Sequence, residues 1–253
     1  MISDKRLIPA CLLAAFSTMH TVSADQWSRE LEIYMLGANI SGDSSMGRVE
    51  GADIDIDFGT ILDTLQMGFM ARFEAVHDSG WGLWLDYGFM DLSDKKKNDR
   101  GGVVSAKLRQ GVLEAYGLYR QQITRGHIDC YAGLRWWDND IDARVNPAIL
   151  PGSLERGISE DWIDPVIGLR WTHEINGQWS TMLRGDVGGF GIGADITWAA
   201  AVAARYHFND AFFLDMQYKA TWVDYSNDDK GSPGHFTYDT VTHGPLLGLT
   251  YKF

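Results

Sequence analysis

Apolar residues stand at every second position through long stretches of this chain, and this period of two constrains its fold more than any other feature. From Phe212 to Trp222 the even-numbered residues are apolar, whereas the odd-numbered residues 215–221 are polar or charged. The same alternation runs through Ile196–Phe208, Ile128–Trp136 and Leu83–Phe89. Because successive side chains of a strand point to opposite faces, the pattern predicts strands with one apolar and one charged face.

Ten such strands are expected, each about as long as a tilted strand must be to cross a bilayer. Tight turns, such as His77–Gly80 and Asn209–Asp210, alternate with longer loops that are rich in Gly, Asp, Asn, Ser and Lys. The longer loops are predicted to begin near Ser41, Ser93, Asp138, Gly188 and Tyr225. The expected strands lie near residues 29–40, 65–76, 81–92, 103–122, 126–137, 161–174, 178–187, 196–208, 211–224 and 244–253.

This alternation also occurs in soluble sandwiches, so the surrounding pattern has to decide between the two folds. Trp and Tyr stand towards the ends of the apolar stripes, as in the aromatic girdles of membrane barrels (Tyr206, Trp222, Trp171, Trp136). Short turns on one side and long loops on the other are typical of the same class, with the short turns in the periplasm. The chain is therefore predicted to be an all-β, transmembrane, antiparallel up-and-down β-barrel.

The strand number depends on one segment in the first long loop. Residues 60–65 have a short helical pattern, with Ile61, Leu62 and Leu65 able to share a face. If the stretch 53–65 formed an extra crossing, the barrel would have twelve strands. Ten is the expected number, with eight and twelve as alternatives.

The first residues have the features of a secretory signal peptide. Lys5 and Arg6 precede an apolar run from Leu7 to Phe16, and small residues follow at 22–24. The expected organisation is a cleaved signal peptide, residues 1–24, and one barrel domain, residues 25–253. After cleavage the net charge is −13, Cys130 is the single cysteine, and no run of eighteen apolar residues remains. This acidic chain lacks the basic surface that nucleic-acid binding requires.

The chain ends in Leu247-Gly248-Leu249-Thr250-Tyr251-Lys252-Phe253, with apolar residues at alternate positions and a terminal Phe. This ending resembles the C-terminal signature of the small outer-membrane β-barrel proteins of Gram-negative bacteria. The resemblance implies insertion into the outer membrane by its assembly machinery, which would recognise Leu249, Tyr251 and Phe253. It further implies contact with outer-membrane lipids and lipopolysaccharide, and it brings no catalytic motif and no cofactor. A monomer is expected.

Charged residues of both signs fall on the inward positions of the predicted strands. Buried charges are tolerated when they are paired, so we expect a network of ion pairs that fills the lumen. An integral, non-enzymatic envelope or surface protein is the main hypothesis, and a narrow, porin-like channel for small solutes is the alternative. The predicted lumen network comprises Arg72, Glu74, Asp86, Glu114, Arg120, Asp129, Arg135, Asp164, Arg170, Arg184, Asp186, Arg205, Asp215 and Lys219.

Two motifs match binding sites only formally. Gly189–Ala194 matches the dinucleotide fingerprint G-x-G-x-x-G/A, but a predicted strand follows where the fingerprint requires a helix. The acidic runs Asp53–Asp57 and Asp138–Asp142 lack the Gly and Glu that complete a calcium loop. No metal site is predicted, although weak cation or lipopolysaccharide contacts at the outer rim stay open.

A barrel enzyme acting on lipid or peptide is a second alternative. Such chemistry needs a base within hydrogen-bond reach of a nucleophile or water. Asp186, Asp195, Asp224 and His243 are all expected near the outer rim, where an Asp/His pair could activate water. Because no family motif accompanies these residues, no catalytic residue is predicted.

Overall fold

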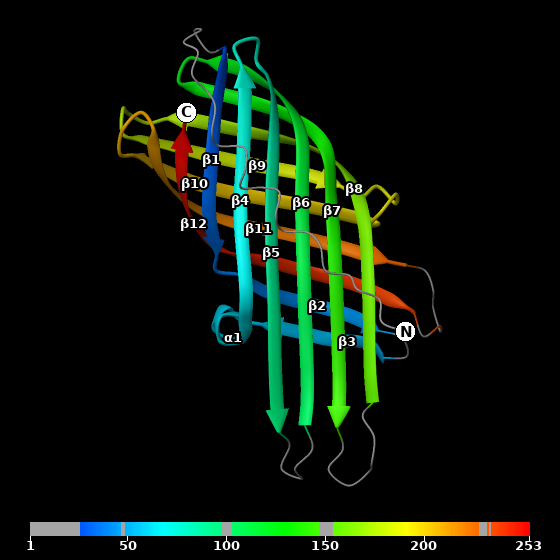
Figure 1. Cartoon of the computed structure of the whole chain (residues 1–253). Helices are drawn as coiled ribbons and strands as arrows, with labels where there is room; N and C mark the ends of the chain where they lie inside the picture. The colour runs from blue at the N-terminus through cyan, green and yellow to red at the C-terminus, as the bar shows by residue number, and fades with distance from the viewer. Residues whose placement is uncertain (1–25, 47–48, 98–102, 147–153, 228–231, 233) are drawn as a thin grey trace, which may run out of the picture.

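Ten strands of the chain close into one antiparallel barrel, because β1 pairs with β4 on one side and with β12 on the other (Figure 1). The computed structural model describes residues 26–46, 49–97, 103–146, 154–227, 232 and 234–253, so the predicted signal peptide lies outside it. The prediction of a ten-stranded barrel is confirmed. The elements are β1 (Trp27–Leu36), β2 (Asn39–Met46), β3 (Val49–Ile56), α1 (Phe58–Thr64), β4 (Leu65–His77), β5 (Trp81–Lys97), β6 (Val103–Ile123), β7 (Gly126–Asn146), β8 (Leu154–Glu174), β9 (Trp179–Gly188), β10 (Ile196–His207), β11 (Phe212–Ser226) and β12 (Phe236–Lys252).

The expected single strand at 29–40 is wrong in one respect, because it breaks after Leu36 and resumes as β2. At the break the Gly37 amide donates to the Pro245 carbonyl oxygen (2.7 Å). Pro245 has no N–H and cannot donate a hydrogen bond to the neighbouring strand, so the regular ladder of β12 with this strand is interrupted there. β1 pairs with the C-terminal half of β12 and β2 with its N-terminal half. β2 and β3 therefore form an added hairpin beyond β1, and not two further crossings.

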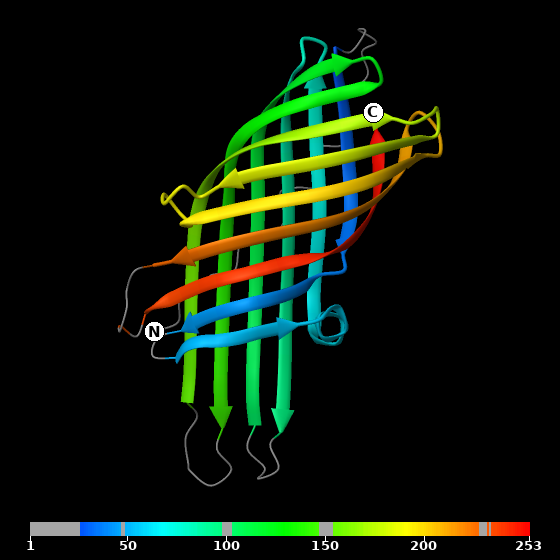
Figure 2. The same ribbon diagram turned by 180° about the vertical axis from the view of Figure 1, so that it is seen from behind.

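All four predicted tight turns are present, and the long connections lie at the opposite end. Besides the first loop, three predicted loops are partly strand instead. The ladder of β5 and β6 runs to Lys97–Val103, that of β7 and β8 to Val145–Leu154, and that of β11 and β12 to Ser226–Thr237. β5–β8 consequently reach beyond the neighbouring strands at the long-loop end (Figures 1 and 2). Loop-like composition misled the prediction there, since a strand that leaves the membrane can carry polar residues on its outer face.

The two faces of the wall differ sharply in exposure. Ile167 and Leu169 on the outer face are 55% and 57% exposed, whereas Asp129 and Arg135 inside the barrel are fully buried. Outward aromatic side chains contact one another near both ends of the apolar belt: Trp179 lies 5.0 Å from Tyr206 between ring centroids, and Trp198 lies 6.5 Å from Trp222. Apolar outside and charged inside is the arrangement that a barrel in lipid requires.

α1 confirms the helical pattern of the first long loop. Asp57 caps it, because its Oδ1 accepts from the Thr60 amide (3.0 Å), and this bond lowers the pKa of the Asp57 carboxyl. Ile61 is buried in a cluster with Ala38 and Met90. Among the residues that the structure describes, no helix is long and apolar enough to span a membrane.

Candidate functional site in the barrel interior

The inward positions of β4–β11 carry all fourteen residues of the predicted network, since each has the inward parity of its strand. The structure brings most of them together in four groups of ion pairs. Eight other inward residues join these groups or lie beside them: Glu30, Glu32, Tyr34, Trp84, Tyr116, Tyr131, Thr197 and Thr250.

The central group joins β6, β7 and β9 across the inner face of the wall. Arg135 Nη2 lies 2.9 Å from Glu114 Oε1 and 2.9 Å from Asp186 Oδ1. Arg184 Nη2 lies 2.9 Å from the other oxygen of each carboxylate. All four side chains are almost fully shielded from solvent, so two cations face two anions where unpaired charge would be costly.

A second group of two arginines and two carboxylates lies towards the short turns. Arg120 donates from Nη2 to Glu74 (2.7 Å) and from Nε to Asp129 (2.8 Å). Arg170 Nη2 donates to Asp129 Oδ2 (2.6 Å) and also to Glu74. Every charge of this group thus has partners of the opposite sign on two strands.

Two further groups tie the first barrel strand to the interior. Arg72 bonds Glu32 and Asp86, each at 2.8 Å. Arg205 bonds Asp215 (2.6 Å) and Glu30 (2.8 Å). Glu30 and Glu32 were missed by the sequence reasoning, although both stand at alternate positions of the predicted strand 29–40.

Trp84 connects three of these groups and is the main residue that the prediction missed. Its ring is 1% exposed, and the guanidinium carbons of Arg72, Arg170 and Arg184 lie 5.3, 4.7 and 4.2 Å from its centroid. Cations over a tryptophan face are attracted by the ring quadrupole, and more strongly when desolvated. The sequence did contain a signal for Trp84, because it is an aromatic residue at an inward position where the neighbouring strands carry charges.

Two members of the predicted network are placed differently from the rest. Asp164 makes hydrogen bonds in place of an ion pair: it accepts from the indoles of Trp137 (2.9 Å) and Trp162 (3.3 Å) and from the Ala194 amide (2.6 Å). Lys219 lies 3.7 Å from Glu114 at the edge of the central group. Among the described contacts of Asp164, three neutral N–H donors take the place that a cation has in the other groups.

An aromatic cluster occupies the interior nearer the long loops. Trp162 stacks on Tyr225, with ring centroids 3.9 Å apart, and on Trp137 at 5.6 Å. Phe236 and Tyr238 belong to the same buried cluster, so aromatic side chains predominate at this level. The barrel interior therefore holds a charged level and an aromatic level.

Two inward cavities lie on either side of the charged level. A cavity of about 500 Å³ lies at the short-turn end, lined by Glu30, Arg120, Arg205 and residues of the turns. A smaller one of about 100 Å³ lies between the charged and aromatic levels, lined in part by Glu114 and Trp137. Its lining includes side chains of both levels.

Gly168, at an inward position of β8, makes room for a neighbouring large side chain. A Cβ there would meet the ring of Tyr131, whose hydroxyl accepts from Arg184 Nε (2.9 Å). We expect Gly168→Ala to lower the free energy of unfolding by about 1–3 kcal/mol, because Tyr131 must move. Gly185→Ala, at an outward position with nothing near the added methyl, is the control for denaturant titrations in detergent. Equal effects of the two changes would contradict this role.

The Asp and His residues considered for catalysis are not brought together as an Asp/His pair. Asp186 lies in the central ion-pair group, whereas His243 has the outward parity of β12 and its Nδ1 lies 2.8 Å from the Tyr218 hydroxyl. Asp224 is also outward on β11, and Asp195 lies beside it, its amide donating to the Asp224 carbonyl oxygen (2.9 Å). An Asp186–His243 pair at the outer rim is therefore excluded.

Neither the dinucleotide-like motif nor the two acidic runs lie in the structural context that a binding site of their kind requires. Gly189–Ala194 forms a turn that contains a positive φ at Phe190 (54°), and it leads into β10, not into a helix. The acidic runs lie on β3 and on the outer part of β7. Among the described residues, no group of three His, Cys, Asp or Glu side chains is arranged to hold a metal ion.

Comparisons with known proteins show a similar fold in bacterial outer-membrane barrels. The chain is similar to the outer-membrane protease OmpT from Escherichia coli, with a TM-score of 0.54, 10% identity and coverage of 92% of this chain and 99% of that one. It is also similar to the translocator domain of the autotransporter NalP from Neisseria meningitidis, with a TM-score of 0.50, 11% identity and coverage of 92% and 90%. No family model and no curated protein matches the sequence. At such identities the similarity concerns the fold alone.

Proposed function

We propose that this chain is an integral protein of the bacterial outer membrane whose interior is closed to solutes and whose long-loop end faces the outside. Its residues 1–24 would be removed on export, and its outer face would contact lipid and lipopolysaccharide. The observation that carries the proposal is the level of paired charges around Trp84, which involves strands from β1 to β9. A barrel of this size leaves an interior that side chains can fill.

The alternative of a narrow channel has one observation in its favour, the 500 Å³ cavity at the short-turn end. A channel would need this cavity to continue past both the charged and the aromatic level. Swelling assays with proteoliposomes in sugars and amino acids separate the two hypotheses. We expect swelling at the protein-free rate, and faster swelling would favour the channel.

Location and orientation are tested by labelling single cysteines in a Cys130→Ser background with a membrane-impermeant maleimide. Ile192→Cys lies in the loop between β9 and β10, where Ile192 is 76% exposed, and Ser79→Cys lies in the turn between β4 and β5. In intact Gram-negative cells we expect the maleimide to label Ile192→Cys and not Ser79→Cys. After permeabilisation of the outer membrane, we expect it to label Ser79→Cys as well. Label on Ser79→Cys in intact cells would contradict the proposed orientation.

The C-terminal residues are proposed as the assembly signal. Leu249, Tyr251 and Phe253 point outward and are 52%, 44% and 45% exposed. Their side chains are therefore available for binding by an assembly receptor while the barrel forms. Deleting Phe253 is expected to reduce the amount of folded barrel in the outer membrane, measured by the faster migration of unboiled protein on gels. Substituting Lys252 with Ala is the control. Equal assembly of both variants would remove Phe253 from the signal.

A further inference from the structure

The barrel wall divides on the side where β1 meets β4. Their pairing ends at Ile33 and Ala71, and the next residues of β1, Tyr34–Leu36, pair with β12 alone. The first residues of β4, from Leu65 to Met70, pair only with β5 in the described part of the chain. Two strands that are neighbours near the short turns therefore separate towards the long loops.

α1 lies at this division and closes it from one side. Its Ile61 is 5% exposed and packs between the β2 residues and the β5 residues of one apolar cluster, among them Ile40 and Leu92. Beside Ile61 on the helix surface, Phe58 and Leu62 are 40% and 54% exposed and line the groove described next. The helix thus seals the wall and leaves an apolar surface outside.

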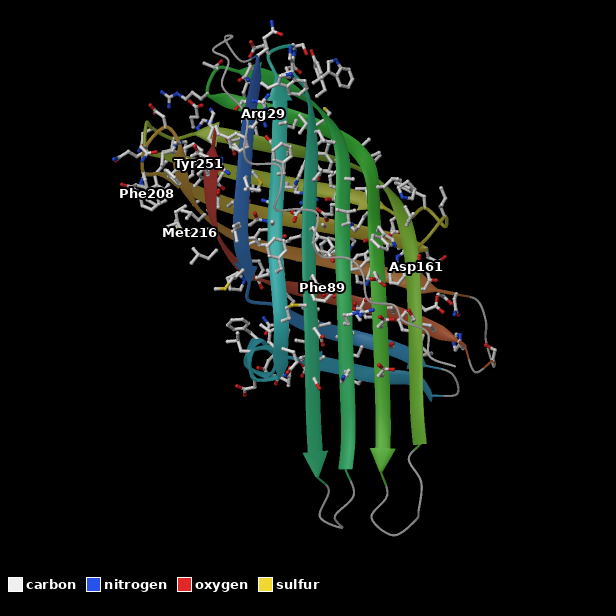
Figure 3. The ribbon with its side chains drawn as sticks, viewed as in Figure 1. Arg29, Phe89, Asp161, Phe208, Met216 and Tyr251 are labelled. Atoms are coloured by element: carbon white, nitrogen blue, oxygen red, sulfur yellow. The ribbon has the colours of Figure 1, made fainter. Side chains whose placement is uncertain are left out.

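An apolar groove of about 770 Å³ runs along the outside of the wall at this division. α1 and the start of β4 form one side, and the outward residues of β10, β11 and β12 form the other, with Met216 projecting from the barrel in Figure 3. The volume lies in the range of pockets that hold small molecules. The groove residues on α1, β4 and β10–β12 that the argument uses are Leu62, Gly68, Ala204, Met216, Tyr218 and Leu247.

The position of the groove decides which molecule fits it. It is continuous with the apolar belt, in which Met35 and Leu247 are 75% and 53% exposed. Six residues, among them Tyr34, Met70 and Met90, line both the groove and the inner cavity of about 100 Å³. The groove is therefore a recess into the wall, where an extended apolar chain gains contacts that the convex part of the belt does not offer.

We propose that this groove binds one acyl chain of a membrane lipid as a defined site, beside α1. The inference rests on the proposed membrane location. A bilayer supplies acyl chains around the whole belt, and the recess between α1 and β10–β12 holds one of them in place. The site is defined by apolar contact alone and does not select a headgroup.

Photocrosslinking tests this site in vesicles of phosphatidylethanolamine and phosphatidylglycerol that contain a trace of phospholipid with a diazirine at the end of one acyl chain. Mass spectrometry then maps the labelled peptides of the full barrel. We expect label concentrated on residues 58–70 and 202–218, and weaker label on the outward faces of β6–β8.

Variants that fill the groove provide a second test of the acyl-chain site. Ala204→Trp and Gly68→Leu should each lower the label on 58–70 about tenfold, because the added side chain occupies the space of several methylene groups. Gly68 has room for a side chain, with its nearest neighbour, the flexible Leu65, 3.5 Å from an added Cβ. Ala132→Trp is the matched control, since Ala132 is outward and exposed on β7, away from the groove.

Each other outcome has a distinct meaning. Even labelling around the belt, or label unchanged in both groove variants, would overturn the acyl-chain site while leaving the membrane location intact. Crosslinks between two copies through residues 58–70 would assign the groove to a dimer and also overturn it. Absence of label from the entire belt would contradict the membrane location itself.

Discussion

Arg135→Met is expected to lower the free energy of unfolding by about 3–5 kcal/mol, because it leaves two buried carboxylates without one of their cations. Arg135 is fully buried, bonds Glu114 and Asp186, and also donates to the Thr197 hydroxyl (3.3 Å). The measurement is a denaturant titration in detergent micelles, with the folded fraction followed on unboiled gels.

Arg109→Met is the matched control, since it also removes one arginine from an ion pair. Arg109 bonds Asp140 on the outer face, where its side chain is 52% exposed. Exposed pairs contribute about 0–1 kcal/mol, so the change should be small. If the two variants lost equal stability, the interior pairs would have no special role.

Trp84→Ala is expected to cost about 3–5 kcal/mol, the range of large aromatic deletions in packed cores. The substitution removes the ring that packs against Arg72, Arg170 and Arg184, and also its edge contacts with Tyr116 (5.6 Å) and Tyr131 (5.3 Å). The cations would then face a void in place of an aromatic surface.

Trp84→Phe distinguishes the contribution of the aromatic face from that of the filled volume. The substitution keeps a smaller aromatic ring beside the arginines. We expect this variant to lose clearly less stability than Trp84→Ala in the same titration. Equal losses would mean that the aromatic face contributes nothing and that only the filled volume matters.

The barrel could be predicted from the sequence because one physical rule acts along the whole chain. Lipid outside and charge inside impose a period of two on every crossing, and Phe212–Trp222 shows it without interruption. The same rule does not act beyond the membrane, so the sequence pattern predicts loops where the outer parts of β5, β7 and β12 continue as strands. The break between β1 and β2 depends on Pro245, more than two hundred residues away in sequence, and local pattern could not indicate it.

The partners of the interior charges could not be predicted from the sequence. Parity along each strand indicates that Arg135 and Asp186 point inward, but the barrel curvature decides that they meet. Asp164 has the same parity and bonds two indoles instead. The prediction missed Trp84 because it considered only charged residues. The aromatic ring contacts several of these charges.

Single-channel recording in planar bilayers tests the closed interior most directly, because small ions pass through gaps that exclude sugars. With the purified, folded protein in concentrated potassium chloride, we expect a current that stays at the baseline of the bare bilayer. Reproducible stepwise openings would contradict it and show that a path runs past both the charged and the aromatic level.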